Sequence, residues 1–331
     1  MSKLHLFNPE NDLALAAATA NYTPPRAARE LHRAGALLPL WYAEPGDCVY
    51  APEADAEAVE RLSARYGLGV SVGTAGDPAP WGWSANAVRQ FRRIGSDGPF
   101  PDVELYRQLS HRRTAMLLHR ALQDALPYRL PASPMEITDV AQLPYGRDFF
   151  IKAPWSGSGR GVADASLLPR RQGERLCAGI IARQGSVMVE PKLDKIRDFA
   201  LLYMVEPDGR VRYRGLSLFF NGSANAYGGN IVAPPGRLAE LLAADYISET
   251  AAVVAAALEP IVSGYTGPVG VDMMLYRGDD GSQTICPTVE VNMRMTMGAV
   301  ALSLARHGFS GNFTIAPAAD GSFSFPLLPM I

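Results

Sequence analysis

The chain is short of the features on which several protein classes depend. Its only cysteines, Cys48, Cys177 and Cys286, lie far apart and form no Cys-x-x-Cys pair. Neither a disulfide framework nor a zinc cluster is indicated, and we expect each cysteine to be a small buried apolar residue. The sequence also has no apolar run of the roughly 18 residues that a membrane-spanning helix requires. We therefore expect no membrane partner.

An excess of charge of one sign is also lacking. The chain has 31 basic and 33 acidic residues, a net charge of −2, so no overall field favours nucleic acid. The Ala-rich stretch 13–20 is preceded by the polar cluster 8–12, which interrupts the apolar core that a signal peptide needs. A composition of 48% hydrophobic and 19% charged residues fits a compact globular protein. We expect a cytoplasmic protein of one large or two to three small domains.

The two familiar phosphate-binding motifs, Walker A and G-x-G-x-x-G, are absent, but another glycine-rich segment is present. Residues 149–162 read FFIKAPWSGSGRGV, a short apolar strand that carries Lys152 and continues into a loop of Gly and Ser. Burying a lysine is costly without a negative partner, and glycines let backbone N–H groups approach an anion. We predict that Lys152 and loop 156–161 bind nucleotide phosphates. The alternative is a solvent-facing lysine and a flexible turn.

The first hundred residues alternate between strand and helix patterns. We expect strands over 3–7, 37–42 and 68–72, with helices after Pro24-Pro25 and over 54–66. Short connections of this kind predict a small parallel α/β unit that ends in the Gly/Pro-rich region 73–101. The polar cluster 8–12 follows the first strand, where such sheets place ligand-facing loops. A helix cap and turn would explain the same cluster.

The remaining chain predicts helices and antiparallel strands around a second α/β block. Helices are expected over 103–125, 170–183, 248–262 and 297–306. Strands are expected at Ile151, over 186–190, and in two hairpins, 199–205 with 212–220 and 269–275 with 284–291. Asp208-Gly209 is a strong signal for the first hairpin turn. The tail 316–331 is expected to cover the core.

Two strand ends carry acidic groups. In the last hairpin, alternation puts Glu290, Asn292 and Arg294 on one face, and Asp272 would lie opposite them. Carboxylate and amide oxygens suit Mg²⁺, and unpaired carboxylates among Val and Met are costly. We therefore favour a metal site over ordinary polar strand faces. The strand 186–190 ends in Glu190, and the extended link that follows could meet the edge of a purine.

The chain resembles the ATP-grasp family in the order of its features, which are the lysine strand, the Ser/Gly loop, the hinge acid, the Asp strand and Glu-x-Asn-x-Arg. The match covers about 103–308. The resemblance implies that Lys152 contacts phosphate, Glu190 lies near the adenine amino group and Asp198 near the ribose. It further implies a flexible loop formed by Ser156, Gly157, Ser158, Gly159 and Gly161. The hinge backbone would be Pro191, Lys192 and Leu193. The ligands for one or two Mg²⁺ would be Asp272, Glu290 and Asn292. The motif Glu290-x-Asn292-x-Arg294 is similar to that of biotin carboxylase and carbamoyl phosphate synthetase, where the arginine faces the reacting centre.

The resemblance also implies a fold class and domains. The class is α/β (α+β), with a small parallel α/β domain at 1–102 and a two-lobed ATP-grasp fold. Its first lobe, 103–185, carries the phosphate loop, and its second lobe, 186–331, carries the hinge and metal site. One departure concerns a lysine that the family has before the first lobe. Here the segment is Ser110-His111-Arg112-Arg113, and we expect Arg112 to substitute, with His111 and Arg113 as alternatives.

The function implied by the resemblance is that of an ADP-forming ligase. ATP and Mg²⁺ would convert a small-molecule carboxylate into an acylphosphate, which an amine or other nucleophile then attacks; Lys152 and Arg294 would be catalytic. Alternatives are a small-molecule kinase and a nucleotide-binding switch without catalysis, and a homodimer is compatible with each. Candidate substrate contacts come from the Gly-rich stretch 220–230 and from the cluster 8–12, namely Asn225, Tyr227, Asn230, Asn8 and Glu10. An irregular surface turn would explain the stretch 220–230 equally well.

Overall fold

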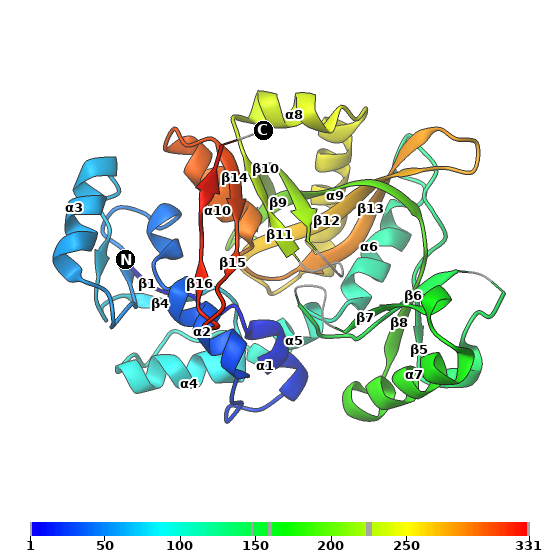
Figure 1. The fold of residues 1–331 in the computed structure, drawn as a ribbon, viewed down its shortest axis with the longest axis horizontal. Coiled ribbons are helices and arrows are strands. Elements are labelled where there is room, and N and C mark those ends of the chain that lie inside the picture. Colours follow the sequence, from blue (N-terminus) through cyan, green and yellow to red (C-terminus); the bar gives the residue numbers. More distant parts are fainter. Residues whose placement is uncertain (1, 147, 158–160, 223–226, 330–331) are drawn as a thin grey trace.

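The computed structural model describes residues 2–146, 148–157, 161–222 and 227–329. The N-terminal part forms a four-stranded parallel sheet in the order β3-β2-β1-β4, as the sequence predicts. Its strands are β1 (Lys3–Leu6), β2 (Cys48–Val49), β3 (Ser71–Val72) and β4 (Asp77–Pro80). The accompanying helices are α1 (Asn11–Ala17), α2 (Arg26–Ala34), α3 (Ala56–Tyr66) and α4 (Ala85–Ile94). This unit contains the N-terminus and lies at one side of the molecule (Figure 1).

One expectation for this unit was wrong, and the region 73–101 holds more regular structure than the sequence predicted. The strand predicted over 37–42 is replaced by a 3₁₀ helix, η1 (Leu38–Trp41), because Pro39 lacks the N–H that a central strand requires. Residues 73–101 contain β4 and α4 in addition to turns. Strand β4 tolerates Pro78 and Pro80 because it forms an edge of the sheet.

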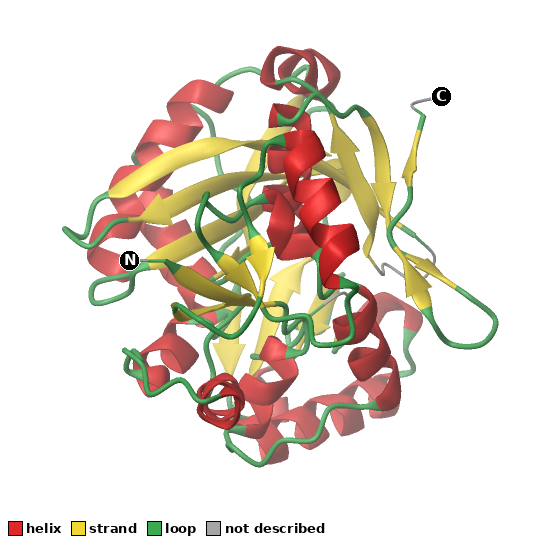
Figure 2. Ribbon diagram, turned by 90° about the vertical axis from the view of Figure 1, so that its left-hand side faces the viewer, coloured by secondary structure: helices red, strands yellow, loops and turns green. Residues whose placement is uncertain are grey.

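A seven-stranded sheet dominates the rest of the molecule, in the order β13-β12-β9-β10-β11-β14-β17. All its pairings are antiparallel. Its strands are β9 (Asp194–Val205), β10 (Val211–Asn221), β11 (Tyr227–Val232), β12 (Gly267–Arg277), β13 (Gln283–Asn292), β14 (Gly311–Thr314) and β17 (Leu327–Leu328). Both predicted hairpins, β9–β10 and β12–β13, are present. The C-terminal strands lie at the edge of the molecule (Figure 2).

Helices cover both faces of this large sheet. They are α5 (Val103–Leu109), α6 (Arg113–Leu122), α8 (Pro235–Leu242), α9 (Ile247–Ile261) and α10 (Met297–Arg306). The hydroxyl of Tyr203 donates to Ala251 O of α9 at 3.2 Å, while Ser217 on the other face packs against Gly298 of α10. The single helix predicted over 103–125 is interrupted between α5 and α6. That break places residues 110–112 beside the cleft described below.

A smaller antiparallel sheet, in the order β5-β8-β6-β7, forms a separate lobe. It comprises β5 (Met135–Ile137), β6 (Phe149–Lys152), β7 (Val162–Asp164) and β8 (Val187–Pro191), packed on α7 (Arg170–Gln184). Helices α5 and α6 pack in the core of the large sheet instead. The boundaries predicted at residues 102 and 185 stay predictions, and the α/β class is confirmed.

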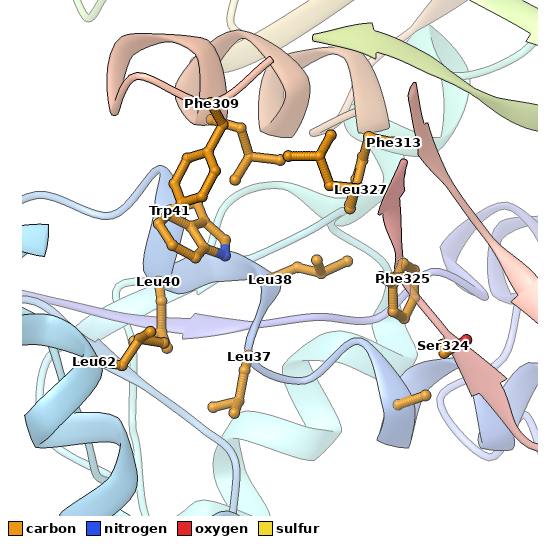
Figure 3. Close-up of a pocket in the computed structure, with 12 residues that line it drawn as sticks. Leu37, Leu38, Leu40, Trp41, Leu62, Phe309, Phe313, Ser324, Phe325 and Leu327 are labelled. Carbon is orange, nitrogen blue, oxygen red and sulfur yellow. The ribbon is translucent and has the colours of Figure 1, made fainter. Parts of the chain in front are cut away.

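An apolar seam joins the N-terminal unit to the C-terminal strands. It encloses a cavity of about 360 Å³ lined by side chains from η1, α3, α10 and residues 309–327. Figure 3 shows Trp41 against Phe309 and Leu38 facing Phe325; the Trp41 and Phe309 rings meet edge-on at 5.2 Å. The tail also forms a short hairpin, β15 (Ala316–Pro317) with β16 (Phe323–Ser324). Apart from Ser324, the cavity is lined by apolar side chains, which indicates packing and not chemistry.

Within the described ranges no single helix is both long and apolar enough to cross a bilayer. Helices α8 and α9 taken together, with a bend of 104° between them, have the length and composition of a span.

Candidate active site

A polar cleft lies where the small sheet, the large sheet and the N-terminal unit meet. It is lined by the hinge residues 190–193 and by side chains from β6, β9, β10, β12, β13 and α10. The sequence-predicted residues that line it are Arg112, Lys152, Glu190, Pro191, Lys192, Leu193, Asp198, Tyr227, Asn230, Asp272, Glu290, Asn292 and Arg294. The predicted residues Ser158, Gly159 and Asn225 lie outside the described residues. Among these predicted residues, the separation along the chain reaches 182 positions, from Arg112 to Arg294.

The strand lysine meets the hinge acid. Lys152 on β6 is buried, 7% exposed, and its ammonium forms an ion pair with the carboxylate of Glu190 on β8. Residue 190 pairs with Phe150 across the two strands, which places both charged groups on one face. The negative partner that a buried lysine requires is therefore supplied by the hinge strand.

Among the three alternatives for the missing lysine, Arg112 reaches the cleft. Its Nε donates to Ala153 O at 3.2 Å and its Nη2 to Ser156 Oγ at 3.3 Å. The same Nη2 lies 3.0 Å from Glu290 Oε1. The backbone N–H of Arg112 also donates to Pro154 O at 3.1 Å, which fixes the break between α5 and α6 against the loop that follows β6. Arg112 therefore connects this loop to the acidic strand β13.

The neighbours of Arg112 point elsewhere. Arg113 forms a two-bond ion pair with Glu136, and His111 packs edge-on against Trp155 at 4.7 Å. Burial, together with the charge of Arg113, lowers the pKa of His111 to about 4. Consistent with a neutral ring, His111 Nδ1 accepts from the backbone N–H of Arg113 at 2.9 Å. Neither side chain lines the cleft.

The acidic residues converge as alternation predicts. Asp272 on β12 is paired directly with Glu290 on β13, and Asn292 Nδ2 donates to Asp272 Oδ2 at 3.1 Å. Burial, followed by the charge of Glu290, raises the pKa of Asp272 to about 7. Two carboxylates held side by side repel each other, and a divalent cation relieves that repulsion.

This set fits Mg²⁺. Within the described ranges no cluster of three or more His, Cys, Asp or Glu side chains could hold a metal, so the protein offers two carboxylates and one amide oxygen. Mg²⁺ is commonly bound by one or two carboxylates, with the remaining positions taken by water and phosphate. The acidic pair, with Arg112 beside it, suits a cation that is shared with a phosphate.

The polar cluster 8–12 contains Asp12, whose role no sequence pattern indicated. Its carboxylate holds Arg294 by three hydrogen bonds, from Nε at 3.0 and 3.1 Å and from Nη2 at 2.7 Å. Burial opposes the charge on Arg294, but Asp12, together with Glu290 and Asp272, outweighs it and raises the pKa of the guanidinium. The two residues are 282 positions apart, so no local pattern indicates the pair.

The other candidate substrate residues divide between the cleft and the N-terminal unit. Tyr227 donates to Asn230, whose Nδ2 donates to Ser217 Oγ at 2.7 Å in the cleft. Asn8 instead bonds the backbone of Gly82 in both directions, at 2.9 and 3.2 Å. Glu10 pairs with His32 and lines a different cavity. Asp198 in the cleft accepts from Lys195 at 2.7 Å and Asn221 at 2.8 Å.

Solved structures share this architecture. No protein-family model matches the sequence, and a search of curated proteins gave no significant match. Pyruvate carboxylase from Rhizobium etli is similar over 94% of this chain and 28% of its own, with 19% identity and a TM-score of 0.52. At that identity the likeness shows a common fold and not a common reaction.

Two further structures are similar to this chain with lower TM-scores. N5-carboxyaminoimidazole synthetase from Staphylococcus aureus, complexed with ADP, is similar over 99% of this chain and 80% of its own, with 14% identity and a TM-score of 0.47. A protein from Archaeoglobus fulgidus, described as of the ATP-grasp superfamily, is similar over 100% of both chains, with 14% identity and a TM-score of 0.49. Both are likenesses of architecture only.

Proposed function

We propose that this chain is an ATP- and Mg²⁺-dependent ligase that forms ADP, as the resemblance of its sequence to the ATP-grasp family implies. Its substrates would be a small-molecule carboxylate and an amine or other nucleophile. The observation that carries this proposal is the meeting of the Asp272–Glu290 pair with Arg112 and Lys152 in one cleft. A cation site beside two cationic side chains is the arrangement that a nucleotide triphosphate requires.

The nucleotide base would lie against the hinge. Glu190 and the backbone of residues 191–193 line the cleft. The N–H of Lys192 already donates to Asp148 O at 3.1 Å, so its carbonyl is the group offered to an adenine amino group. Asp198 would accept from a ribose hydroxyl, and it is held for this by Lys195 and Asn221.

The phosphates would extend from Lys152 toward Arg112, Ser156 and the loop that follows. Asp272, Glu290 and Asn292 would hold Mg²⁺, which when bound supplies charge neutralisation and orientation for the transferred phosphoryl group. Arg112 and Lys152 would add positive charge from either side. These residues act by position and charge, and none needs to form a covalent bond.

The reaction would then proceed in two displacements. A carboxylate oxygen of the substrate attacks the terminal phosphorus of ATP, and ADP leaves with the electron pair of the broken P–O bond. The resulting acylphosphate is attacked at its acyl carbon by the nucleophile, which loses a proton as inorganic phosphate leaves. Arg294, at the end of the cleft beside Asp12, would stabilise the negative charge on the carboxyl group in both steps.

The acceptor side of the site would be formed by Tyr227 and Asn230, whose side chains line the cleft. Asn225 belongs to the same segment. Asn8 and Glu10 would support the N-terminal unit rather than contact the substrate, since neither lines the cleft. A cytoplasmic location stays a prediction.

The test is release of ADP from Mg·ATP with a panel of amino acids, dipeptides and small carboxylates. We expect ADP release that depends on an acceptor and is lost in Glu290→Gln and Lys152→Ala. Glu240→Gln and Lys3→Ala are matched controls, because they make the same changes at exposed positions far from the cleft. Phosphorylation of a hydroxyl with no ligated product would favour a kinase. ATP binding without turnover would favour a switch, and absence of ATP binding would contradict the proposal.

A further inference from the structure

The pair formed by Asp12 and Arg294 joins the N-terminal unit to the end of the catalytic hairpin. Asp12 lies in the first turn of α1, and Arg294 follows β13 by two residues. Both side chains are 16% exposed and both line the cleft. An ion pair with two or more bonds in such a partly buried place fixes the plane of the guanidinium as well as its position.

The hydrogen bonds use three of the five N–H groups of the Arg294 guanidinium. Asp12 accepts from Nε and Nη2, the side-on edge, and Met295 O accepts from Nη1 at 3.1 Å. Each Nη atom carries two N–H groups, so one N–H remains on Nη1 and one on Nη2. These two donors form the end of the guanidinium, a fork whose spacing matches the two oxygens of a carboxylate.

Further contacts hold this arrangement in place. The backbone N–H of Met295 donates to Trp81 O at 2.8 Å, which ties the turn after β13 to the N-terminal sheet. On the other side, a Cβ added to Gly157 would lie 2.6 Å from Asp12 Oδ2. Only glycine lets the phosphate loop approach Asp12 this closely. The carboxylate of Asp12 is therefore confined between Arg294 and the loop.

We infer that Asp12 is a positioning residue that turns the end of Arg294 toward the carboxylate of the substrate. This inference rests on the proposed function and adds to it a residue from the N-terminal unit and a geometry of recognition. Asp12 occupies the side-on edge, so a substrate carboxylate binds end-on through Nη1 and Nη2. Asp12 itself makes no contact with the substrate.

The test follows the side-chain N–H signals of Arg294 by NMR in isotope-labelled protein, with sodium acetate as the carboxylate probe. The signals are assigned by their loss in Arg294→Lys. We expect separate Nη1 and Nη2 signals in the wild type, because bonds on one side slow rotation, and a saturable shift with acetate that sodium chloride does not cause. Averaged Nη signals in the wild type, or no response to acetate, would overturn the inference.

Asp12→Asn supplies the second arm. We expect it to weaken acetate binding about tenfold or more, equivalent to ~1.4 kcal/mol, and to average the Nη signals. Glu30→Gln is the matched control, since Glu30 holds Arg33 by the same side-on edge at 3.3 and 2.9 Å outside the cleft. An Asp12→Asn protein that binds acetate like wild type contradicts the inference. Binding of Mg·ADP in the same samples separates the two proposals, because its absence in wild type contradicts the ligase function alone.

Discussion

Replacing Arg112 by Ala tests which cation of the segment 110–113 binds the nucleotide in the proposed site. The truncation removes bonds to Ala153 O and Ser156 Oγ and the 3.0 Å contact with Glu290. Removing one partner of a buried, hydrogen-bonded charge pair costs about 2–5 kcal/mol. It also removes the ion-pair partner of Glu290, which lies beside Asp272. Taking ~3 kcal/mol as the share that appears in binding, Mg·ATP affinity should fall about 100-fold.

The assay is isothermal titration with Mg·ADP and Mg·ATP, alongside urea unfolding to separate binding from stability. Arg113→Ala is the matched control, because Arg113 is half exposed and pairs with Glu136 outside the cleft. We expect Arg113→Ala to change nucleotide affinity less than about twofold, as surface ion pairs contribute little. The nucleotide affinity of Arg112→Lys should lie between those of Arg112→Ala and the wild type, since lysine keeps the positive charge but lacks the paired N–H donors of the guanidinium. An equal or greater loss of affinity in Arg113→Ala would refute this reasoning.

Two further predictions concern stability. Asp47 accepts from Lys3 N, Glu44 N and His5 Nε2 at 2.8–3.0 Å. Asp47→Asn weakens these hydrogen bonds to a carboxylate and should lower the free energy of unfolding by about 1.5–3 kcal/mol, measured by urea titration; a loss below about 0.5 kcal/mol would contradict this. Burial lowers the pKa of His5 although Asp47 opposes it. The stability that the neutral His5 ring contributes is therefore complete above the pKa of the unfolded state, about 6.5, and is lost as the pH falls below that value. Unfolding followed from pH 8 to pH 5 in wild type and His5→Gln should show a steeper decline in wild type, and parallel curves would refute it.

How far the sequence predicts this molecule depends on the range of each interaction. Alternation along a strand is a local property, so the pairing of Asp272 with Glu290 followed from the sequence and was confirmed. The buried lysine likewise required an acid, and Glu190 supplies it. Arg112 could be named only as one of three, because a break between helices has no fixed period and its direction depends on the tertiary contact with Pro154.

Other features depend on contacts that a local pattern does not contain. The 3₁₀ helix η1 replaced a predicted strand because the apolar run that contains Pro39 packs in the seam against Phe309 and the tail. The sequence of strand β4, with its two prolines, is typical of a linker, and only its place at the sheet edge explains why it forms a strand. Asp12 and Arg294 meet only once the N-terminal unit has docked on the hairpin.

The link between the two sheets is two residues long. Strand β8 ends at Pro191 in the small sheet, and β9 begins at Asp194 in the large one, so Lys192 and Leu193 connect the two sheets and also line the cleft. The backbone angles of these two residues therefore contribute to the angle between the sheets. In the proposed site, a bound base would contact the same residues, so its binding would be coupled to that angle without a relay through other side chains.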